Sequence, residues 1–362
     1  MDITQKLKQL LQSKKFQLLI VAFIILAVLP LIITDNFFLY VLTMICIFTI
    51  YAASWNFLAN SGQGSLGHAA FLGLGGFSAA LLGTSISTTL INVFGSGLQV
   101  GALSVTIQVL LVLVGGVISA GIGLLIGLAC VRLKAWYLAM VTFGFSVILS
   151  AISNQFDSFT NGINGFSPPT LVTKGFPFYI LVICFTVSSV AVMYLIMRSR
   201  MGLAFRAIHG NEPEAKMIGI NTAKYKLIAF VISTFFAGIA GGLDVYFLRF
   251  VDNSIFAPAN SFLPLIMAVI GGLGTVAGPI IGSVFWVSIQ QILTLPSVAD
   301  SLHNSIGPYF PTVSNVGTPI SLIIIGVILV VIVIFAPKGL ISIFEKTYRY
   351  LTKPETKKEK TK

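Results

Sequence analysis

Side chains that could act as acids, bases or metal ligands are few in this sequence and lie far apart. There are three histidines, His68, His209 and His303, and 11 acidic residues among 362. Acid–base and metal-assisted chemistry both need such groups to converge on one site. The loop charges described below also place His209 and His303 on opposite sides of a membrane. We therefore predict no catalytic site, no metal site and no cofactor in this chain, and a membrane-embedded enzyme is disfavoured.

Polar groups do gather in one glycine-rich stretch, Ser61 to Phe77, which reads SGQGSLGHAAFLGLGGF. Irregular backbone at membrane depth is tolerated only where it is buried in protein or lines water, and its free amide dipoles can face a polar substrate. We therefore expect Gln63, Ser65, Gly67 and His68 to belong to a transport path. The alternative, equally open, is that Ser65 only caps a helix and His68 lies at the headgroup interface.

A second candidate is the polar segment between Met197 and Leu227, which contains a short helix with its own start and stop. Asn211 is the expected N-cap, Pro213 suits an early helical position, and Glu214 stands where a capping box requires it. Gly219 can end the helix. A short capped helix held between two spans is suited to transmitting a push, whereas the residues alone favour a solvated connector.

The sequence offers no energy source of its own. It contains no G-x-x-x-x-G-K motif followed by Ser or Thr, so ATP would have to be bound by partner subunits. Ion-coupled carriers commonly place charged residues within the membrane. Asp244 is the only acidic residue in a predicted span, and we expect it to lie near the outer interface, paired with Arg249; a substrate ammonium group is the alternative partner. An ion-coupled carrier is therefore the second, disfavoured hypothesis.

The elements that position these residues are predicted to be membrane-spanning helices. Hydrophobic residues make up 56% of the chain and charged residues 9%, and the mean hydropathy is +0.97. A spanning helix needs about 20 mainly apolar residues. We predict an all-α polytopic membrane protein with about ten spans, the eighth and ninth being short. The spans are Phe16–Ile33, Phe37–Ala59, Leu66–Leu82, Val100–Val131, Trp136–Gln155, Phe178–Met197, Leu227–Phe247, Phe262–Gly272, Thr275–Ile292 and Pro319–Phe335.

The distribution of basic residues predicts the orientation. If the amino terminus is cytoplasmic, only Lys174 and Arg249 of the 22 basic residues lie outside. Cytoplasmic loops carry the excess of lysine and arginine, so both termini are expected inside. The predicted organisation is a basic N-terminus over 1–15, a transmembrane domain over 16–336 with a cytoplasmic segment over 198–226, and a basic tail over 337–362. We expect the tail to face membrane lipid and to bind no nucleic acid.

Small residues spaced four apart are expected to mark helix contact faces, because helices in lipid associate by close packing. Three predicted spans carry them. These residues are Gly115, Ser119, Gly123 and Gly127 in the fourth span, Gly238 and Gly242 in the seventh, and Gly274, Gly278 and Gly282 in the ninth.

An ordered set of motifs resembles the permease subunits of branched-chain amino acid ABC importers, specifically the LivM-like branch. The stretch at Ser61–Phe77 resembles the family signature GQ-x-SLGHAAF. Further agreement comes from GLAFRAIHGNEPEAKMIGINTAKYKLIAFVIS at Gly202–Ser233, PLIMAVIGGLGTVAGPIIG at Pro264–Gly282, TNGINGF at Thr160–Phe166 and FAPKGL at Phe335–Leu340. The resemblance covers nearly the whole chain from Phe37 to Leu340.

The resemblance implies an ABC importer permease fold in a bacterial inner or plasma membrane. It implies three kinds of partner: a second related permease, two ATPase subunits that bind ATP, and an extracellular or periplasmic substrate-binding protein. The implied substrates are branched-chain or other hydrophobic amino acids, with urea, amides and other small solutes as the alternative. It adds Asn164 to the path residues and makes 198–226 a coupling segment that docks on the ATPase. The implied docking residues are Arg206, Ala207, Glu212, Glu214, Ala215 and Gly219.

Overall fold

The computed structural model describes residues 35–94, 102–131, 133, 135–156, 160–298, 300–301, 317–336 and 339–342. The predicted span Phe16–Ile33, the predicted tail beyond residue 342 and His303 lie outside this part of the chain. Its long helices are α3 (Asn36–Ala59), α4 (His68–Phe94), α5 (Ala102–Cys130), α6 (Ala135–Gln155), α8 (Phe176–Arg198), α11 (Thr222–Leu248), α13 (Ala277–Thr294) and α15 (Gly317–Phe335). Its shorter elements are η2 (Gly162–Asn164), α9 (Arg200–Gly210), α10 (Glu212–Met217), η3 (Asn253–Phe256) and α12 (Pro258–Gly271).

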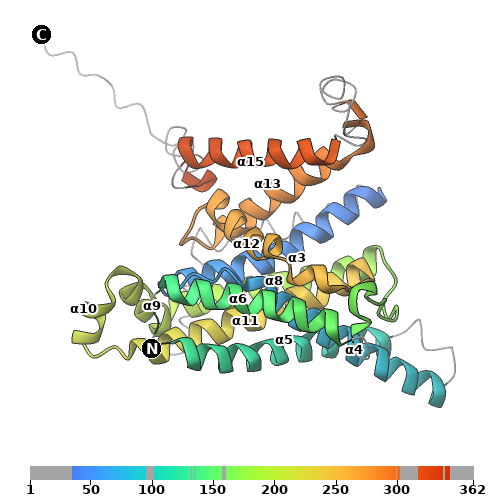
Figure 1. The fold of residues 1–362 in the computed structure, drawn as a ribbon, viewed down its shortest axis with the longest axis horizontal. Coiled ribbons are helices and arrows are strands. Elements are labelled where there is room, and N and C mark those ends of the chain that lie inside the picture. Colours follow the sequence, from blue (N-terminus) through green and yellow to red (C-terminus); the bar gives the residue numbers. More distant parts are fainter. Residues whose placement is uncertain are drawn as a thin grey trace, which may run out of the picture.

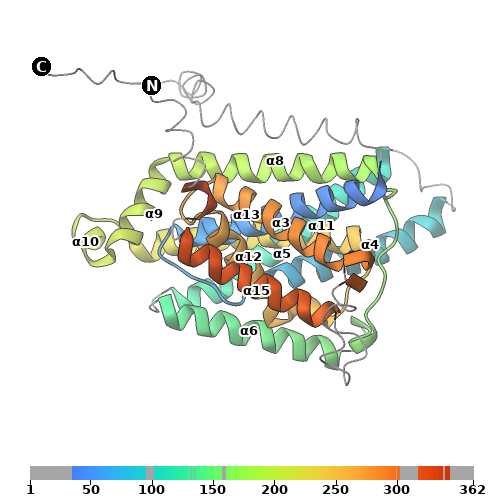
Figure 2. The same ribbon diagram turned by 90° about the horizontal axis from the view of Figure 1, so that it is seen from above.

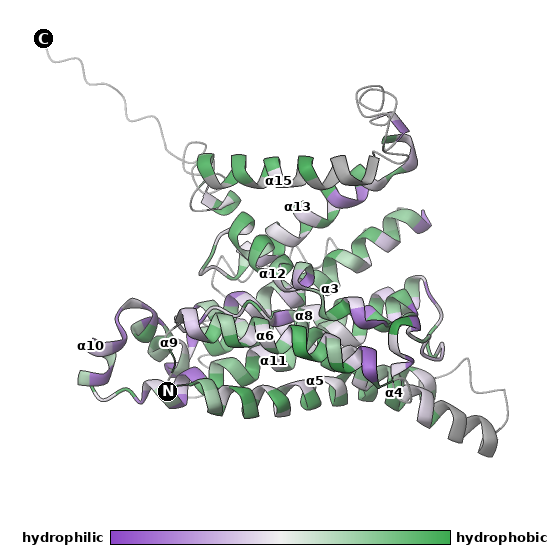
Figure 3. Ribbon diagram, in the orientation of Figure 1, coloured by the Kyte–Doolittle hydropathy of each residue, from purple (hydrophilic) through white to green (hydrophobic). Residues whose placement is uncertain are grey.

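The prediction of an all-α polytopic membrane protein is confirmed. Seven helices of the described residues are long and apolar enough to cross a membrane, namely α3, α4, α5, α6, α8, α11 and α13. The predicted eighth span, α12, has 14 residues, which is too short to cross by itself. Hydrophobic residues run along the spanning helices, and hydrophilic ones gather at their ends and on α10 (Figure 3).

Helix α11 is the centre of the fold and packs against α3, α4 and α5 (Figures 1 and 2). Its small residues allow backbones to touch. A β-carbon added to Gly241 would lie 1.8 Å from the carbonyl oxygen of Leu72, and one added to Gly238 would lie 2.6 Å from the β-carbon of Ser119. Ser119 is fully buried, and its hydroxyl lies within 3.0 Å of carbonyl oxygens on α4 and α11. The small face of α5 therefore brings three helices into contact.

The small residues predicted as the contact face of the ninth span lie in and before α13, which packs against α12. A β-carbon added to Gly282 would lie 1.8 Å from the carbonyl oxygen of Met267, and one added to Gly278 would lie 2.1 Å from the carbonyl oxygen of Gly272. Gly274 is different, because it precedes α13 and has a φ of +77°. The expectation that it shares a helix face with the other two was wrong; its N–H instead donates to Asn56 Oδ1 at 3.0 Å.

Candidate functional site

Helices α9 and α10 extend past one end of the spanning bundle, and we call residues 199–221 the projection (Figures 1 and 2). Helix α9 begins where the Ser199 hydroxyl accepts a hydrogen bond from the N–H of Met201 at 3.1 Å. Phe205, a residue of α9 itself, is fully buried, and its ring lies edge-on to that of Phe57. The sequence predicted only one helix in this segment and missed α9, although a serine before a helical run is a start signal.

The start of α10 confirms the predicted N-cap. The Asn211 side chain accepts from the backbone N–H of Glu214 at 3.5 Å. The predicted capping box is not formed in its usual way, because the Asn211 N–H already donates to the carbonyl of Ala207 at 3.1 Å. The Glu214 carboxylate instead accepts from the side-chain amide of Asn211. Both residues therefore stabilise the first turn through their side chains.

The end of α10 confirms the predicted role of Gly219, which has a φ of +84°. Its N–H donates to the carbonyl of Lys216, and the N–H of Ile220 donates to that of Ala215, each at 3.0 Å. This pair of bonds is a Schellman motif, which needs a left-handed residue at the position of Gly219. The six-residue helix therefore has a defined stop as well as a defined start.

The surface of the projection differs from the predicted docking set. Arg206, Glu214 and Gly219 are exposed, and Ala207 and Glu212 are partly buried. Ala215 is only 2% exposed and faces the rest of the subunit, so in this conformation it cannot contact a partner. Two large apolar side chains outside that predicted set are strongly exposed at the tip, Met217 at 82% and Ile218 at 75%. The sequence did contain a signal for this exposed apolar tip: Met217 and Ile218 are adjacent and directly precede Gly219, which ends an otherwise polar helix.

Glu212 connects the projection to α11. Its carboxylate pairs with the ammonium of Lys226, accepts from the Thr222 hydroxyl at 3.2 Å, and lies 3.1 Å from the ammonium of Lys216. Desolvation raises the pKa of this carboxyl, but the hydrogen bonds and charges of Lys226 and Lys216 together outweigh it and hold the pKa below its ordinary value. Glu212 is therefore ionised at neutral pH.

The segment Ser61–Gly67 joins α3 to α4 without regular structure, and we call it the elbow. The Gln63 amide donates to the backbone carbonyl of Lys226 at 2.8 Å and to the Ser61 hydroxyl at 3.1 Å. The carbonyl of Ser65 accepts from the Trp55 indole at 2.7 Å. Gln63 and Ser65 are 6% and 0% exposed, so both predicted path residues are turned into the subunit here.

The elbow lies directly against α6. An added β-carbon at Gly67 would come within 1.7 Å of the carbonyl oxygen of Thr142, while the neighbouring Gly64 has no atom within 4 Å of that position. The N–H of Leu66 donates to the Thr142 hydroxyl at 3.3 Å, and on the other side the N–H of Ala69 donates to the Ser261 hydroxyl on α12 at 3.3 Å. Gly67 is thus required for backbone-to-backbone contact.

His68, the first residue of α4, is completely buried. Its Nε2 lies 2.9 Å from the Ser54 hydroxyl, and its ring centroid lies 5.5 Å from that of Tyr51. The alternative that placed His68 at the headgroup interface is therefore wrong. The Ser65 hydroxyl accepts from the N–H of Gly67 at 3.4 Å, one residue before α4 begins, so it orders the elbow rather than the first turn of the helix.

Two other predicted positions lie away from the elbow. Asn164 is exposed on η2, in a loop held by an antiparallel bridge between Phe166 and Val251, beyond the end of α11 opposite to Lys226. Asp244 does not form the expected ion pair with Arg249 in the described structure, and its buried Oδ1 has no hydrogen-bond partner. Arg249 instead ends α11 in a left-handed conformation, with a φ of +60°. The predicted pair was wrong.

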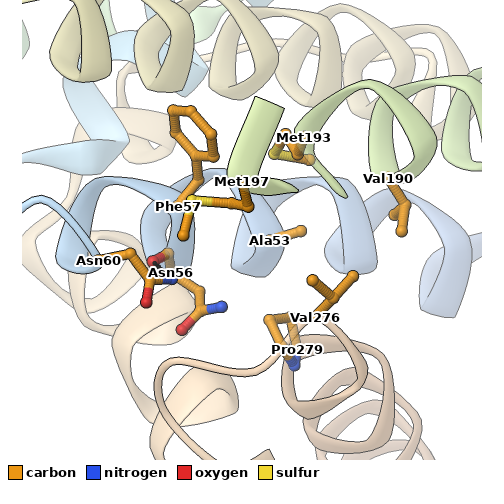
Figure 4. Close-up of a pocket in the computed structure, with 9 residues that line it drawn as sticks. All are labelled: Ala53, Asn56, Phe57, Asn60, Val190, Met193, Met197, Val276 and Pro279. Atoms are coloured by element: carbon orange, nitrogen blue, oxygen red, sulfur yellow. Dashed lines mark hydrogen bonds between the residues drawn. The ribbon is translucent and has the colours of Figure 1, made fainter. Parts of the chain in front are cut away.

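A small pocket lies between α3, α8 and the start of α13 (Figure 4). Asn56 and Asn60 supply its polar side, and Phe57, Met193 and Met197 lie on its apolar side. Its free space of about 20 Å³ is enough for about one water molecule and too little for an amino acid. The Asn56 amide also donates to the carbonyl of Thr275 at 2.8 Å, which fixes the loop before α13.

The sequence matches the family model described as "Branched-chain amino acid transport system / permease component" over residues 37–333. The chain belongs to this family. Among its relatives is the high-affinity branched-chain amino acid transport system permease protein LivM of Escherichia coli, which is 26% identical over 95% of this chain and 77% of its own length. LivM of Salmonella typhimurium is 26% identical over 87% of this chain and 70% of its own length. A xylose transport system permease protein, XylH of Haemophilus influenzae, is 31% identical over 34% of each chain. No solved structure matches this permease.

Proposed function

We propose that this permease is one transmembrane subunit of an ABC importer in a bacterial inner or plasma membrane. It pairs with a second related permease and two ATPase subunits, and it receives substrate from an extracellular or periplasmic binding protein. ATP is bound and hydrolysed by the ATPases, since this sequence has no phosphate-binding loop. ATP-driven movement of the ATPases reopens the path between the two permeases by alternating access.

The observation that carries this proposal is the projection. A helix that is capped at both ends holds two apolar side chains, Met217 and Ile218, in solvent beyond the spanning helices. Exposed apolar side chains at a rigid tip suit insertion into a groove on a partner protein. We assign Arg206, Ala207, Glu214 and Gly219 to the rim of this contact, and Glu212, whose carboxylate pairs with Lys226, to the support that holds α10 from within the subunit. Ala215 packs beneath it.

Charge supports a cytoplasmic position for the projection. Arg198, Arg200, Arg206, Lys216 and Lys224 all lie on or beside it, whereas Lys174 and Arg249 lie at the other end of the spanning helices. By the positive-inside rule we propose that this end of the spanning helices is cytoplasmic and that both termini lie on the same side. ATPase subunits that use cytoplasmic ATP would meet the projection on that side.

The substrate path is proposed to run between this subunit and the second permease. The pocket of Figure 4 cannot hold an amino acid, and the side chains of Gln63, Ser65 and His68 are turned inward. We propose that the elbow, with Gly67, lines the path only after it moves. Asn164 is exposed on η2 and is proposed to lie at the outer mouth.

Branched-chain or other hydrophobic amino acids are the proposed substrates, because the two LivM relatives carry that name. Urea, amides and other small solutes are the alternative. Binding measurements on the cognate extracellular receptor of this permease distinguish these classes. The proposal predicts that leucine, isoleucine or valine binds that receptor more tightly than urea or an amide.

Co-purification tests the role of the projection. Tagged permease extracted in mild detergent should retain both ATPases. The amount of ATPase that co-purifies with the double variant Met217→Asp with Ile218→Asp should be lower by at least about tenfold. Ile163→Asp is the matched control, because Ile163 is 76% exposed but lies on η2 at the opposite end. Retention of the ATPases by the double variant would contradict docking at this tip.

A further inference from the structure

The short helix α10 cannot be rigid by itself. It has six residues, and isolated helices of that length are not stable in water. Its connection to α11 passes through Gly219, which is exposed and touches nothing at the position of a β-carbon. A push at the tip would therefore deform this connection unless side chains fix α10 to the spanning helices.

Glu212 provides such a fixation. Its carboxylate contacts two side chains of the first turns of α11, the ammonium of Lys226 and the hydroxyl of Thr222. The Lys226 side chain is only 8% exposed, and that of Glu212 is 33% exposed. A partly buried ion pair is screened less by salt than an exposed one, and removing one charge leaves the other buried without its partner. The contact with Lys216 is different, because that side chain is 60% exposed.

The same lysine is connected to the elbow through its backbone. The carbonyl oxygen of Lys226 accepts from the Gln63 amide at 2.8 Å, and Gln63 is 6% exposed. One residue therefore binds α10 with its side chain and the elbow with its carbonyl. These two contacts join segments 14 and 163 residues away from Lys226 in the sequence.

The elbow carries the connection on to two more helices. The N–H of Leu66 donates to Thr142 on α6, and the N–H of Ala69 donates to Ser261 on α12. Gly67 lies against the α6 backbone, so the elbow cannot slide without moving α6 or breaking these bonds. A displacement of the start of α11 can therefore be passed through buried contacts to the start of α4, to α6 at Thr142 and to the first turn of α12 at Ser261.

We propose that Glu212 and Lys226 are positioning residues that transmit movement of α10 to the elbow. This inference rests on the proposed function, because it assigns the pathway by which ATPase movement reaches the membrane. The pair fixes α10 to α11, and the Lys226 carbonyl fixes α11 to Gln63. Loss of either charge frees α10 from the start of α11, but Met217 and Ile218 remain at the end of α10 as its apolar docking side chains.

The test is coupled transport by the assembled complex in liposomes, with radiolabelled leucine as the probe. Glu212→Gln keeps the shape of the side chain and removes its charge. The variant should retain its ATPases but transport about tenfold less leucine per ATP hydrolysed, within the usual range of coupling energies. Lys224→Met is the control, because it removes an exposed charge two residues from Lys226 and should leave this ratio unchanged. The charge exchange Glu212→Lys with Lys226→Glu should restore at least half of the ratio.

A wild-type ratio in Glu212→Gln would overturn the assignment, even if less complex assembled. If the wild-type complex itself shows no ATP-dependent leucine uptake, the proposed function fails and the pathway with it, so the two failures are distinguishable. Backbone hydrogen exchange gives a second readout without transport. Glu212→Gln should speed exchange at Leu66 and Ala69 by about tenfold, whereas faster exchange confined to α10 would show that the pair acts only locally.

Discussion

Substitution of Gly67 tests the contact between the elbow and α6 most sharply. In Gly67→Ala the new β-carbon would lie 1.7 Å from the carbonyl oxygen of Thr142 and 2.1 Å from its carbonyl carbon. Ordinary contact begins at 3.4 Å, so the two backbones would have to separate by 1.7 Å. No rotamer change relieves this overlap, because the opposing atoms belong to the backbone. The movement would also break the bond from the Leu66 N–H to the Thr142 hydroxyl.

Overpacking of a tight core costs about 1 to 3 kcal/mol, and a lost hydrogen bond adds about 1 kcal/mol. We therefore expect Gly67→Ala to lower the free energy of unfolding by about 2 to 4 kcal/mol. The assay is the midpoint of thermal unfolding of the purified permease in detergent, which should fall by several degrees. Gly64→Ala is the matched control, since its new β-carbon meets nothing within 4 Å. Equal midpoints for the two variants would refute the close approach of elbow and helix.

Three further predictions concern topology, capping and helix packing. A cysteine that replaces Asn164, which is exposed on η2, should react with an impermeant thiol reagent in intact cells, whereas one that replaces Lys216 should react only after the membrane is opened. Labelling of Lys216→Cys in intact cells would reverse the predicted orientation. Asn211→Ala should destabilise α10 by about 1 kcal/mol and speed its backbone hydrogen exchange, with no change in the amount of folded permease; unchanged exchange would show that the cap is dispensable. Ser119→Val should lower the thermal midpoint more than Ser119→Ala, because Gly238 packs so closely against Ser119 that a β-carbon added to Gly238 would lie 2.6 Å from the Ser119 β-carbon. Equal midpoints for the two variants would contradict tight packing there.

The spans and caps could be predicted from sequence because their causes are local. Continuous apolar runs determined α3, α5 and α6 to within two residues, and Asn211 and Gly219 marked the two ends of α10. Helix α9 was missed because its 11 residues alternate apolar side chains with basic ones and with glycine, and so form no long continuous apolar run. Its burial depends on the ends of α8 and α11, which no short stretch of sequence reveals.

The orientation of polar side chains could not be predicted, because it depends on partners distant in sequence. His68 looked equally suited to a path and to an interface, yet it packs beside Ser54 and Tyr51 inside the subunit. Gln63 looked like a path residue, yet its amide is satisfied by a carbonyl on α11. Asp244 and Arg249 are five residues apart at the end of α11, but the left-handed turn at Arg249 breaks the helical register that a pair would use.

The energy source of transport is the central claim, and one measurement tests it most directly. The permease, its partner permease, both ATPases and the binding protein are reconstituted in liposomes, and leucine uptake is followed with ATP on the ATPase side or with a sodium or proton gradient. We expect uptake to require ATP and the binding protein and to be unaffected by collapse of the gradients. Uptake that needs no ATP and follows an ion gradient would contradict the importer assignment.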